Sequence, residues 1–158
     1  GIIPAPGRRG VLKQGVVIDP NTYAPFNTQN TAYLREFAPC FLMCPQFQRY
    51  DDIWASFLCQ RIMREKDYRL HIGQPFVWQQ RNEHDLVADL KAEMLGTEFT
   101  PQFGKWLDEF EFKSDDVNKM VREFYRQLPS LFPTFSGGII DVQPLAEAWF
   151  EDVQEALA

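Results

Sequence analysis

The stretch QFQRYDDIWASF, residues 46–57, decides the organisation of this chain, because a polar segment with two adjacent carboxylates leads directly into an apolar one. Beyond Asp51 and Asp52, apolar side chains recur every three or four positions and fall on one face of a helix: Trp54, Leu58 and Ile62. This period is typical of a helix with one buried side. We therefore predict a helix over about residues 53–65 that the aspartate pair opens.

The composition is that of a globular chain. Of the 158 residues, 45% are hydrophobic and 15% aromatic, which is enough to bury a core without disulfides or metal ions. Sixteen Lys and Arg stand against 22 Asp and Glu, and this acidic balance argues against nonspecific binding to nucleic acid or to an anionic membrane. No run reaches the roughly eighteen consecutive apolar residues that a membrane span needs, so we expect none in this segment.

The chain contains three cysteines, Cys40, Cys44 and Cys59, which lie among apolar neighbours. Their odd number and surroundings indicate reduced, buried thiols rather than a disulfide framework or half of a zinc site. Unpaired thiols and the lack of a signal-type segment favour the cytoplasm. The Golgi lumen is the alternative if a parent chain carries a membrane anchor.

Turn residues divide the first hundred residues into further elements. Three stretches are predicted as strands: VLKQGVVID at 11–19, YRLHIG at 68–73 and PFVWQ at 75–79. A second helix is expected over about residues 83–95, with Asn82 as its N-cap and Gly96 as its stop. Its predicted inward side carries three apolar residues: Leu86, Leu90 and Met94.

From about residue 100 the sequence predicts helices only. They begin at Thr100-Pro101, at Ser114 and at Pro144, and their apolar residues recur at helical spacing, as in a packed core. The predicted inward residues are, for the three helices in turn, Phe103, Trp106, Leu107 and Phe110; Val117, Val121, Phe124 and Leu128; and Leu145, Trp149, Val153 and Leu157. We therefore divide the chain into residues 1–99, which carry the candidate chemistry, and residues 100–158, a helical C-terminal extension for packing or for formation of a homo-oligomer.

The residues alone leave two interpretations of the aspartate pair open. One Asp at a helix N-terminus accepts a hydrogen bond from a free backbone N–H, and this contact stabilises a protein by roughly 1 kcal/mol. Capping does not explain two adjacent carboxylates, which repel each other unless a cation, a sugar hydroxyl or an arginine meets one of them. Since the helix dipole keeps such a carboxylate ionised, it is also suited to accept a proton from a hydroxyl.

A second polar cluster lies in QQRNEHDLVADL, residues 79–90. Arg81 and the N–H groups of a helix start are suited to bind a phosphate, and His84 could contact that phosphate or a metal ion. A solvated histidine without a function is the alternative interpretation.

A third cluster is the loop PFNTQNTAY, residues 25–33, which is too polar for a core. Its amides are suited to hydrogen-bond a sugar or a base: Asn27, Gln29 and Asn30. The same amides could equally satisfy their own backbone in a turn.

The order of these motifs resembles that of a known family. PFNTQNTAYLREF, RYDDIWASFLCQRI and GQPFVWQQRNEHDLVADLKAE follow one another as in the plant reversibly glycosylated polypeptides, also called UDP-arabinopyranose mutases. The chain is similar also to the STELLO family of glycosyltransferase-like proteins, in the elements PFN-Q-T, DIW, QR and RN-H. The resemblance covers roughly residues 17–95, and RYDDIWA and RNEH are its most specific parts.

The resemblance implies an α/β fold: the C-terminal, acceptor-side part of a GT-A-type nucleotide-sugar transferase fold with a mixed sheet, followed by a helical tail. It also implies an enzyme, namely a metal-dependent glycosyltransferase or sugar mutase that uses a nucleotide-sugar donor, expected to be UDP-linked, and a carbohydrate or protein acceptor. Asp52 would then be the catalytic base, and Asp51 would position it or contact the sugar.

The same resemblance implies the remaining site residues. His84 would bind the divalent metal, Mn or Mg, or the diphosphate next to it. Substrate binding would fall to six residues: Arg49, Trp54, Arg81, Asn27, Gln29 and Asn30. Arg61 would support the same charge as Arg49.

The chain also departs from the family pattern. GT-A enzymes carry an Asp-x-Asp metal motif at the end of a strand, preceded by a nucleotide-binding βαβ unit, and these 158 residues contain neither. We therefore expect the missing N-terminal half of a parent chain as a partner. Two alternatives stay open: a non-catalytic glycosyltransferase-like domain that organises other enzymes through its aromatic helices after residue 100, and an unrelated α/β module whose aspartates only cap a helix.

Overall fold

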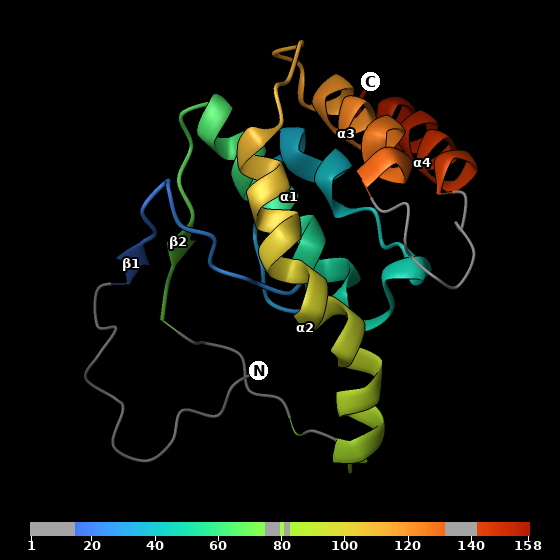
Figure 1. Cartoon of the computed structure of the whole chain (residues 1–158). Coiled ribbons are helices and arrows are strands. Elements are labelled where there is room, and N and C mark those ends of the chain that lie inside the picture. The colour runs from blue at the N-terminus through green and yellow to red at the C-terminus, as the bar shows by residue number, and fades with distance from the viewer. Residues whose placement is uncertain (1–14, 75–79, 81–82, 132–141) are drawn as a thin grey trace.

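The computed structural model of the chain describes residues 15–74, 80, 83–131 and 142–158. The elements follow in the order β1 (Val16–Val17), the 3₁₀ helices η1 (Arg35–Phe41) and η2 (Pro45–Tyr50), α1 (Asp51–Glu65), β2 (His71–Ile72), α2 (Leu86–Glu109), α3 (Val117–Leu131) and α4 (Gln143–Leu157). Figure 1 shows α1 in the middle of the molecule, with α2 passing in front of it and α3 beside α4 on one flank.

The described part of the chain is mostly helical, and its only sheet pairs β1 with β2 in antiparallel register, Val16 opposite Ile72 and Val17 opposite His71. The prediction of a GT-A-type α/β fold with a mixed sheet is therefore wrong. These strands cannot organise a core, because Val16 and Val17 are 42% and 61% exposed. Within the described parts of the strand signals, residues 15–19 and 68–73, two residues each are paired. Residues 11–14 and the strand predicted at 75–79 lie outside the described residues.

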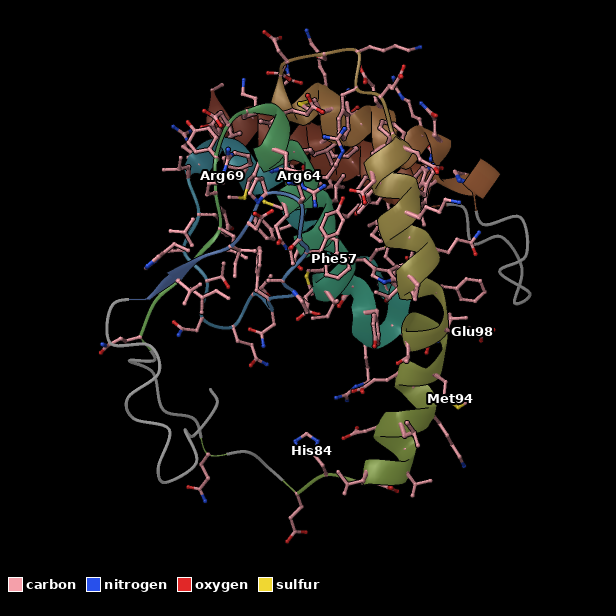
Figure 2. All side chains as sticks on the ribbon, turned by 60° about the vertical axis from the view of Figure 1, so that its left-hand side comes forward. Phe57, Arg64, Arg69, His84, Met94 and Glu98 are labelled. Carbon is pink, nitrogen blue, oxygen red and sulfur yellow. The ribbon has the colours of Figure 1, made fainter. Side chains whose placement is uncertain are left out.

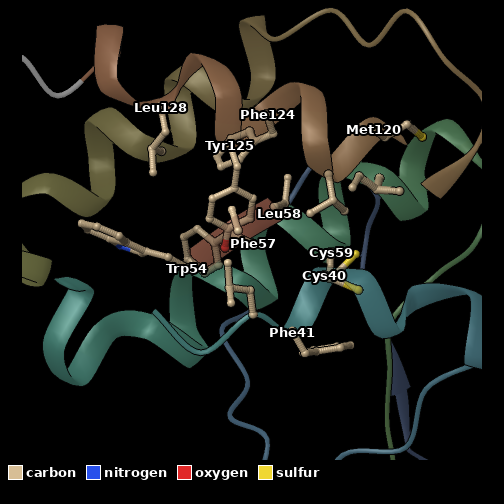
Figure 3. Close-up of a cluster of buried hydrophobic side chains, with 14 of the residues drawn as sticks. Cys40, Phe41, Trp54, Phe57, Leu58, Cys59, Met120, Phe124, Tyr125 and Leu128 are labelled. Carbon is tan, nitrogen blue, oxygen red and sulfur yellow. The ribbon is translucent and has the colours of Figure 1, made fainter. Parts of the chain in front are cut away.

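Helix α1 forms the centre of the core. It begins at Asp51, two residues before the predicted start, and every side chain from Trp54 to Gln60 is buried, because η1, η2, α2 and α3 all pack against it. The face predicted to be inward is confirmed, since Trp54, Leu58 and Ile62 are at most 2% exposed. Figure 3 shows the side chains of α1 packed against Phe124 and Tyr125 of α3.

Helix α2 replaces two predicted helices with one continuous helix. Gly96 does not stop it; the ring of Tyr50 lies where a side chain would stand, only 2.0 Å from an ideal Cβ position. Glycine is needed there for close packing rather than for a turn. The N-cap is Asp85, whose carboxylate accepts hydrogen bonds from the N–H groups of Val87 and Ala88, and the predicted cap, Asn82, lies outside the described residues.

The inward face predicted for this helix is wrong in its first half. Leu86, Leu90 and Met94 are 78%, 63% and 60% exposed, because the first turns of α2 extend beyond the rest of the molecule. The second half packs as expected, with Phe103 and Leu107 buried.

Helices α3 and α4 complete the core. The predicted inward residues of α3 are all buried: Val117, Val121, Phe124 and Leu128. In α4 the predicted face is confirmed only in part: Val153 is buried, whereas Leu145 is 37% exposed, and the unpredicted Ala146 and Phe150 are buried as well. Helix α2 runs continuously across residues 99 and 100, and the division of the chain at that point stays a prediction.

The three cysteines are buried free thiols, as predicted. Burial raises the pKa of Cys44 to about 11. Burial also raises the pKa of Cys40 well above its ordinary value, and the neighbouring Cys59 raises the pKa of Cys40 further. Among residues 15–74, 80, 83–131 and 142–158, no helix has both the length and the hydropathy needed to cross a membrane.

Candidate functional site

The aspartate pair forms the first turn of α1. Tyr50 is the N-cap and makes no side-chain capping bond, whereas Asp51 accepts a hydrogen bond from the N–H of Asp52 at 2.7 Å. Asp51 therefore satisfies a free amide of the first turn, which is the structural role that the sequence left open. Asp51 occupies the first position of the helix, whereas the N-cap position belongs to Tyr50.

Asp52 is half-buried, and opposing effects act on its charge. Burial raises its pKa above the ordinary value, the negative charge of Asp51 raises it further, and backbone hydrogen bonds and the charge of Arg49 lower it. The net direction is upward. Asp52 thus holds a proton more strongly than an ordinary aspartate, although the helix dipole alone was expected to keep it ionised.

Arg49 connects the aspartate pair to the start of α2. Its Nη1 lies 3.0 Å from Oδ1 of Asp89, and its Nε donates a hydrogen bond to Glu93 at 3.0 Å. The other carboxylate oxygen of Asp89 lies 3.1 Å from Nδ1 of His84. Two motifs about thirty residues apart in the sequence, the aspartate pair and His84, therefore lie at one edge of the molecule, joined by Arg49 and Asp89.

The side chains at this edge lie on one side of α2. Figure 2 shows His84 at the projecting end of the helix, on the side opposite to Met94 and Glu98. Arg49 and His84 are both partly exposed, 46% and 38% at their side chains, so solvent reaches the edge.

The amide loop approaches the same edge along α1. The side chain of Gln60 accepts a hydrogen bond from the N–H of Ala24 and donates one to its carbonyl, both at 3.0 Å. One turn nearer to the helix start, the hydroxyl of Ser56 accepts a hydrogen bond from the N–H of Phe26. These bonds therefore hold Phe26 beside Ser56, which lies one helical turn from Asp52.

The loop turns at this point. The side chain of Asn27 accepts a hydrogen bond from the N–H of Gln29, and its carbonyl accepts one from the hydroxyl of Thr31. Asn27 therefore closes its own turn, as the second interpretation of this loop held. Gln29 and Asn30 are exposed, and their role in substrate binding stays a prediction.

Two residues expected near a ligand have structural partners instead. Trp54 is 2% exposed, stacks on Phe103 with ring centroids 4.9 Å apart, and donates a hydrogen bond to Thr100. Arg61 donates to the carbonyls of Leu107 and Phe110, and so it satisfies the C-terminal end of α2. Arg81 lies outside the described residues.

The residues at this edge do not form a metal site by themselves. Within the described ranges, no group of three or more His, Cys, Asp or Glu side chains is placed to hold a metal ion. His84 and Asp89 would offer two ligands, but one oxygen of Asp89 is already paired with Arg49. A divalent metal therefore needs ligands from outside these residues, and its binding stays a prediction.

The residues that assemble this edge were not predicted from the sequence. Asp89 and Glu93 hold Arg49, and Ser56 and Gln60 hold the amide loop. The i, i+4 spacing of Asp89 and Glu93 could have indicated their role, because it places both carboxylates on one face of a helix. Ser56 and Gln60 have the same spacing, and they are polar residues in an otherwise apolar stretch.

The remaining expectation concerns the aromatic helices after residue 100 as an interaction surface. Five of their aromatic side chains are at most 5% exposed: Phe103, Phe110, Phe124, Tyr125 and Phe150. These rings build the core and are not available to a partner. A shallow pocket lies at the other end of α1, where Arg64 and Arg69 line it.

No protein-family model matches the chain, and a search of curated proteins finds no match either.

Proposed function

We propose that this chain provides the acceptor side and the catalytic base for sugar transfer from a nucleotide-sugar, expected to be UDP-linked, with Asp52 as the base. The observation that supports this proposal most strongly is the chain of ion pairs from Arg49 through Asp89 to His84, which brings the aspartate pair and His84 to one edge, while the loop is held at Phe26 one helical turn from Asp52. These are the motifs on which the resemblance to reversibly glycosylated polypeptides and STELLO proteins rests.

The proposed chemistry is a displacement at the anomeric carbon. Asp52 accepts the proton of the acceptor hydroxyl while the hydroxyl oxygen bonds to the anomeric carbon. The bond from that carbon to the diphosphate oxygen breaks, and the nucleoside diphosphate leaves with the bonding electrons. A raised pKa supports this role, because a base works best when its pKa lies near the working pH.

The cationic residues have complementary roles in this proposal. Arg49, fixed by Asp89 and Glu93, limits the repulsion between the two aspartates. His84, and Arg81 by the resemblance, would neutralise the leaving diphosphate. The nucleotide-sugar, the carbohydrate or protein acceptor, a divalent metal and an N-terminal half of a parent chain are the partners that this proposal requires.

The test is nucleoside diphosphate release from a panel of UDP-sugars, with and without Mn²⁺, by the natural protein that carries this chain. Asp52→Asn keeps the size of the side chain but removes the base, so we expect turnover to fall at least about a hundredfold with donor affinity within about threefold. Asp67→Asn, an exposed aspartate paired with Arg69 far from this edge, is the matched control and should behave as wild type.

Two results would overturn the proposal. One is equal turnover by Asp52→Asn and Asp67→Asn. The other is the absence of turnover for every UDP-sugar in the panel in both metal conditions.

A further inference from the structure

The first half of α2 presents apolar side chains to solvent on a projecting helix (Figure 1). Four large side chains are between 60% and 78% exposed: Leu86, Val87, Leu90 and Met94. Contiguous apolar patches of this kind mark interaction sites in soluble proteins, because burying them is favourable and leaving them in water is not.

These four side chains form one stripe that faces away from the core. At 100° per residue they fall within an arc of roughly 100°. Asp89, Glu93 and Gly96, which contact Arg49 and Tyr50, lie on the neighbouring side of the helix, centred roughly 100° from the middle of the stripe. Figure 2 agrees with this arrangement, since Met94 points away from the molecule and His84 lies on the other side of the helix. The helix is thus packed on one face and unpartnered on the other.

The charges around the stripe indicate what kind of partner fits it. The carboxylates of Glu83 and Asp85 lie at its start and that of Glu98 at its end, against one basic residue, Lys91, and the whole chain has a net charge of −6. A partner surface with an apolar centre and Lys or Arg at its rim complements this pattern. An anionic membrane does not, since it would be repelled.

A second copy of the chain fits less well than a basic helix. Antiparallel pairing of two stripes would place Glu98 of each copy near Asp85 of the other, and these like charges repel.

We propose that the apolar stripe of α2, residues Leu86, Val87, Leu90 and Met94, docks a basic amphipathic helix of a partner protein. The acidic residues at both ends of the stripe orient the partner and contact its Lys and Arg side chains. Docking at this face goes beyond sugar transfer and does not depend on it, because none of the four residues belongs to the Asp52 edge.

The test uses two synthetic peptides with the same apolar residues, KLLKALAKLLKALAK and its counterpart with Glu at every Lys. Binding is measured by fluorescence anisotropy with wild type and with the double variant Leu90→Gln, Met94→Gln, which keeps good helix formers at exposed positions. Val17→Gln, which changes an equally exposed apolar residue on β1, is the matched control. Circular dichroism verifies that each variant is folded.

We expect wild type and Val17→Gln to bind the basic peptide at least tenfold more tightly than the acidic one, and the double variant to lose at least tenfold in affinity. Raising the salt from 0.05 to 0.5 M should weaken binding. No binding by wild type, equal binding of both peptides or unchanged binding by the double variant would overturn the proposal. So would a wild-type homodimer, or binding to phosphatidylserine vesicles, that the double variant abolishes.

Discussion

One substitution at Asp52 distinguishes its two possible roles, a carboxylate with a raised pKa and a helix cap. Because its folded-state pKa is raised, the ionised form destabilises the fold; this penalty is present above the folded-state pKa and disappears as the pH falls towards the ordinary value of 3.8. Asp52→Asn should therefore leave the free energy of unfolding at pH 7 unchanged or raise it by less than about 1 kcal/mol. The difference from wild type should vanish near pH 4.

Urea unfolding between pH 4 and pH 8 measures this difference. A loss of about 1 kcal/mol at pH 7 would mean instead that Asp52 acts mainly as a helix cap.

Gly96 is the second residue with a sharp expectation. An alanine there would place its Cβ 2.0 Å from the ring of Tyr50, so Gly96→Ala should cost about 1–3 kcal/mol of stability. Gly104→Ala is the control on the same helix, because its Cβ would meet only the ring of Tyr23, at 3.9 Å. That substitution should be neutral or stabilising by up to about 1 kcal/mol, since alanine is the better helix former.

Thermal unfolding of both variants checks the prediction. The cost of Gly96→Ala should shrink in a Tyr50→Ala background, where the ring is absent. A cost that is the same in both backgrounds would exclude the ring as its cause.

At the scale of elements, α2 should behave as two halves. Its first turns contact little beyond Arg49 and depend on the cap at Asp85, whereas its second half lies in the core. Asp85→Ala should therefore speed amide hydrogen exchange over residues 86–94 severalfold and change the global free energy of unfolding by less than about 0.5 kcal/mol. Uniform exchange along α2, in wild type or variant, would contradict this division.

The elements also show which sequence signals sufficed. Helices α1 and α3 were predicted with their inward faces, because a single apolar stripe and three or more packed neighbours leave little ambiguity. The extent of helix α2 was not predicted, because Gly96 and Pro101 are residues at which helices usually end or begin. The sequence contains no sign that the ring of Tyr50, from another element, fills the space at Gly96. The projecting stripe was mistaken for a core face for the same reason: apolar periodicity does not reveal what covers it.

The parts of the candidate site were found from the sequence, but their assembly was not. The aspartate pair, His84 and the amide loop stand out by residue type alone. The bonds that join them run between Arg49 and Asp89, 40 positions apart, and between Gln60 and Ala24, 36 apart, and such contacts depend on the tertiary fold. Trp54 is buried in the core, and an aromatic residue in a motif is as readily a core residue as a binding one.

For the whole molecule, the expected mixed sheet failed because it rested on resemblance and short strand-like stretches, whereas most of the apolar mass lies in aromatic side chains at helical spacing. A core built in this way protects its thiols. We expect Cys40, Cys44 and Cys59 to resist alkylation in the folded state, because they are buried and burial raises the pKa of Cys44 to about 11.

Alkylation followed by mass spectrometry over a urea titration measures this protection. All three thiols should become reactive together, at the unfolding midpoint. Reaction of any one of them well below that midpoint would contradict a single core around α1.

The central claim is that the Asp52 edge is where this molecule meets a nucleotide-sugar. Its most direct test is a titration of the ¹⁵N-labelled chain with UDP-sugars and Mg²⁺, monitored by amide chemical shifts. We predict that the amides of Asp52, His84 and Asp89 shift together and saturate with one dissociation constant. Shifts confined to the pocket around Arg64 and Arg69, roughly 18 Å away along α1, or no shifts at all, would contradict the claim.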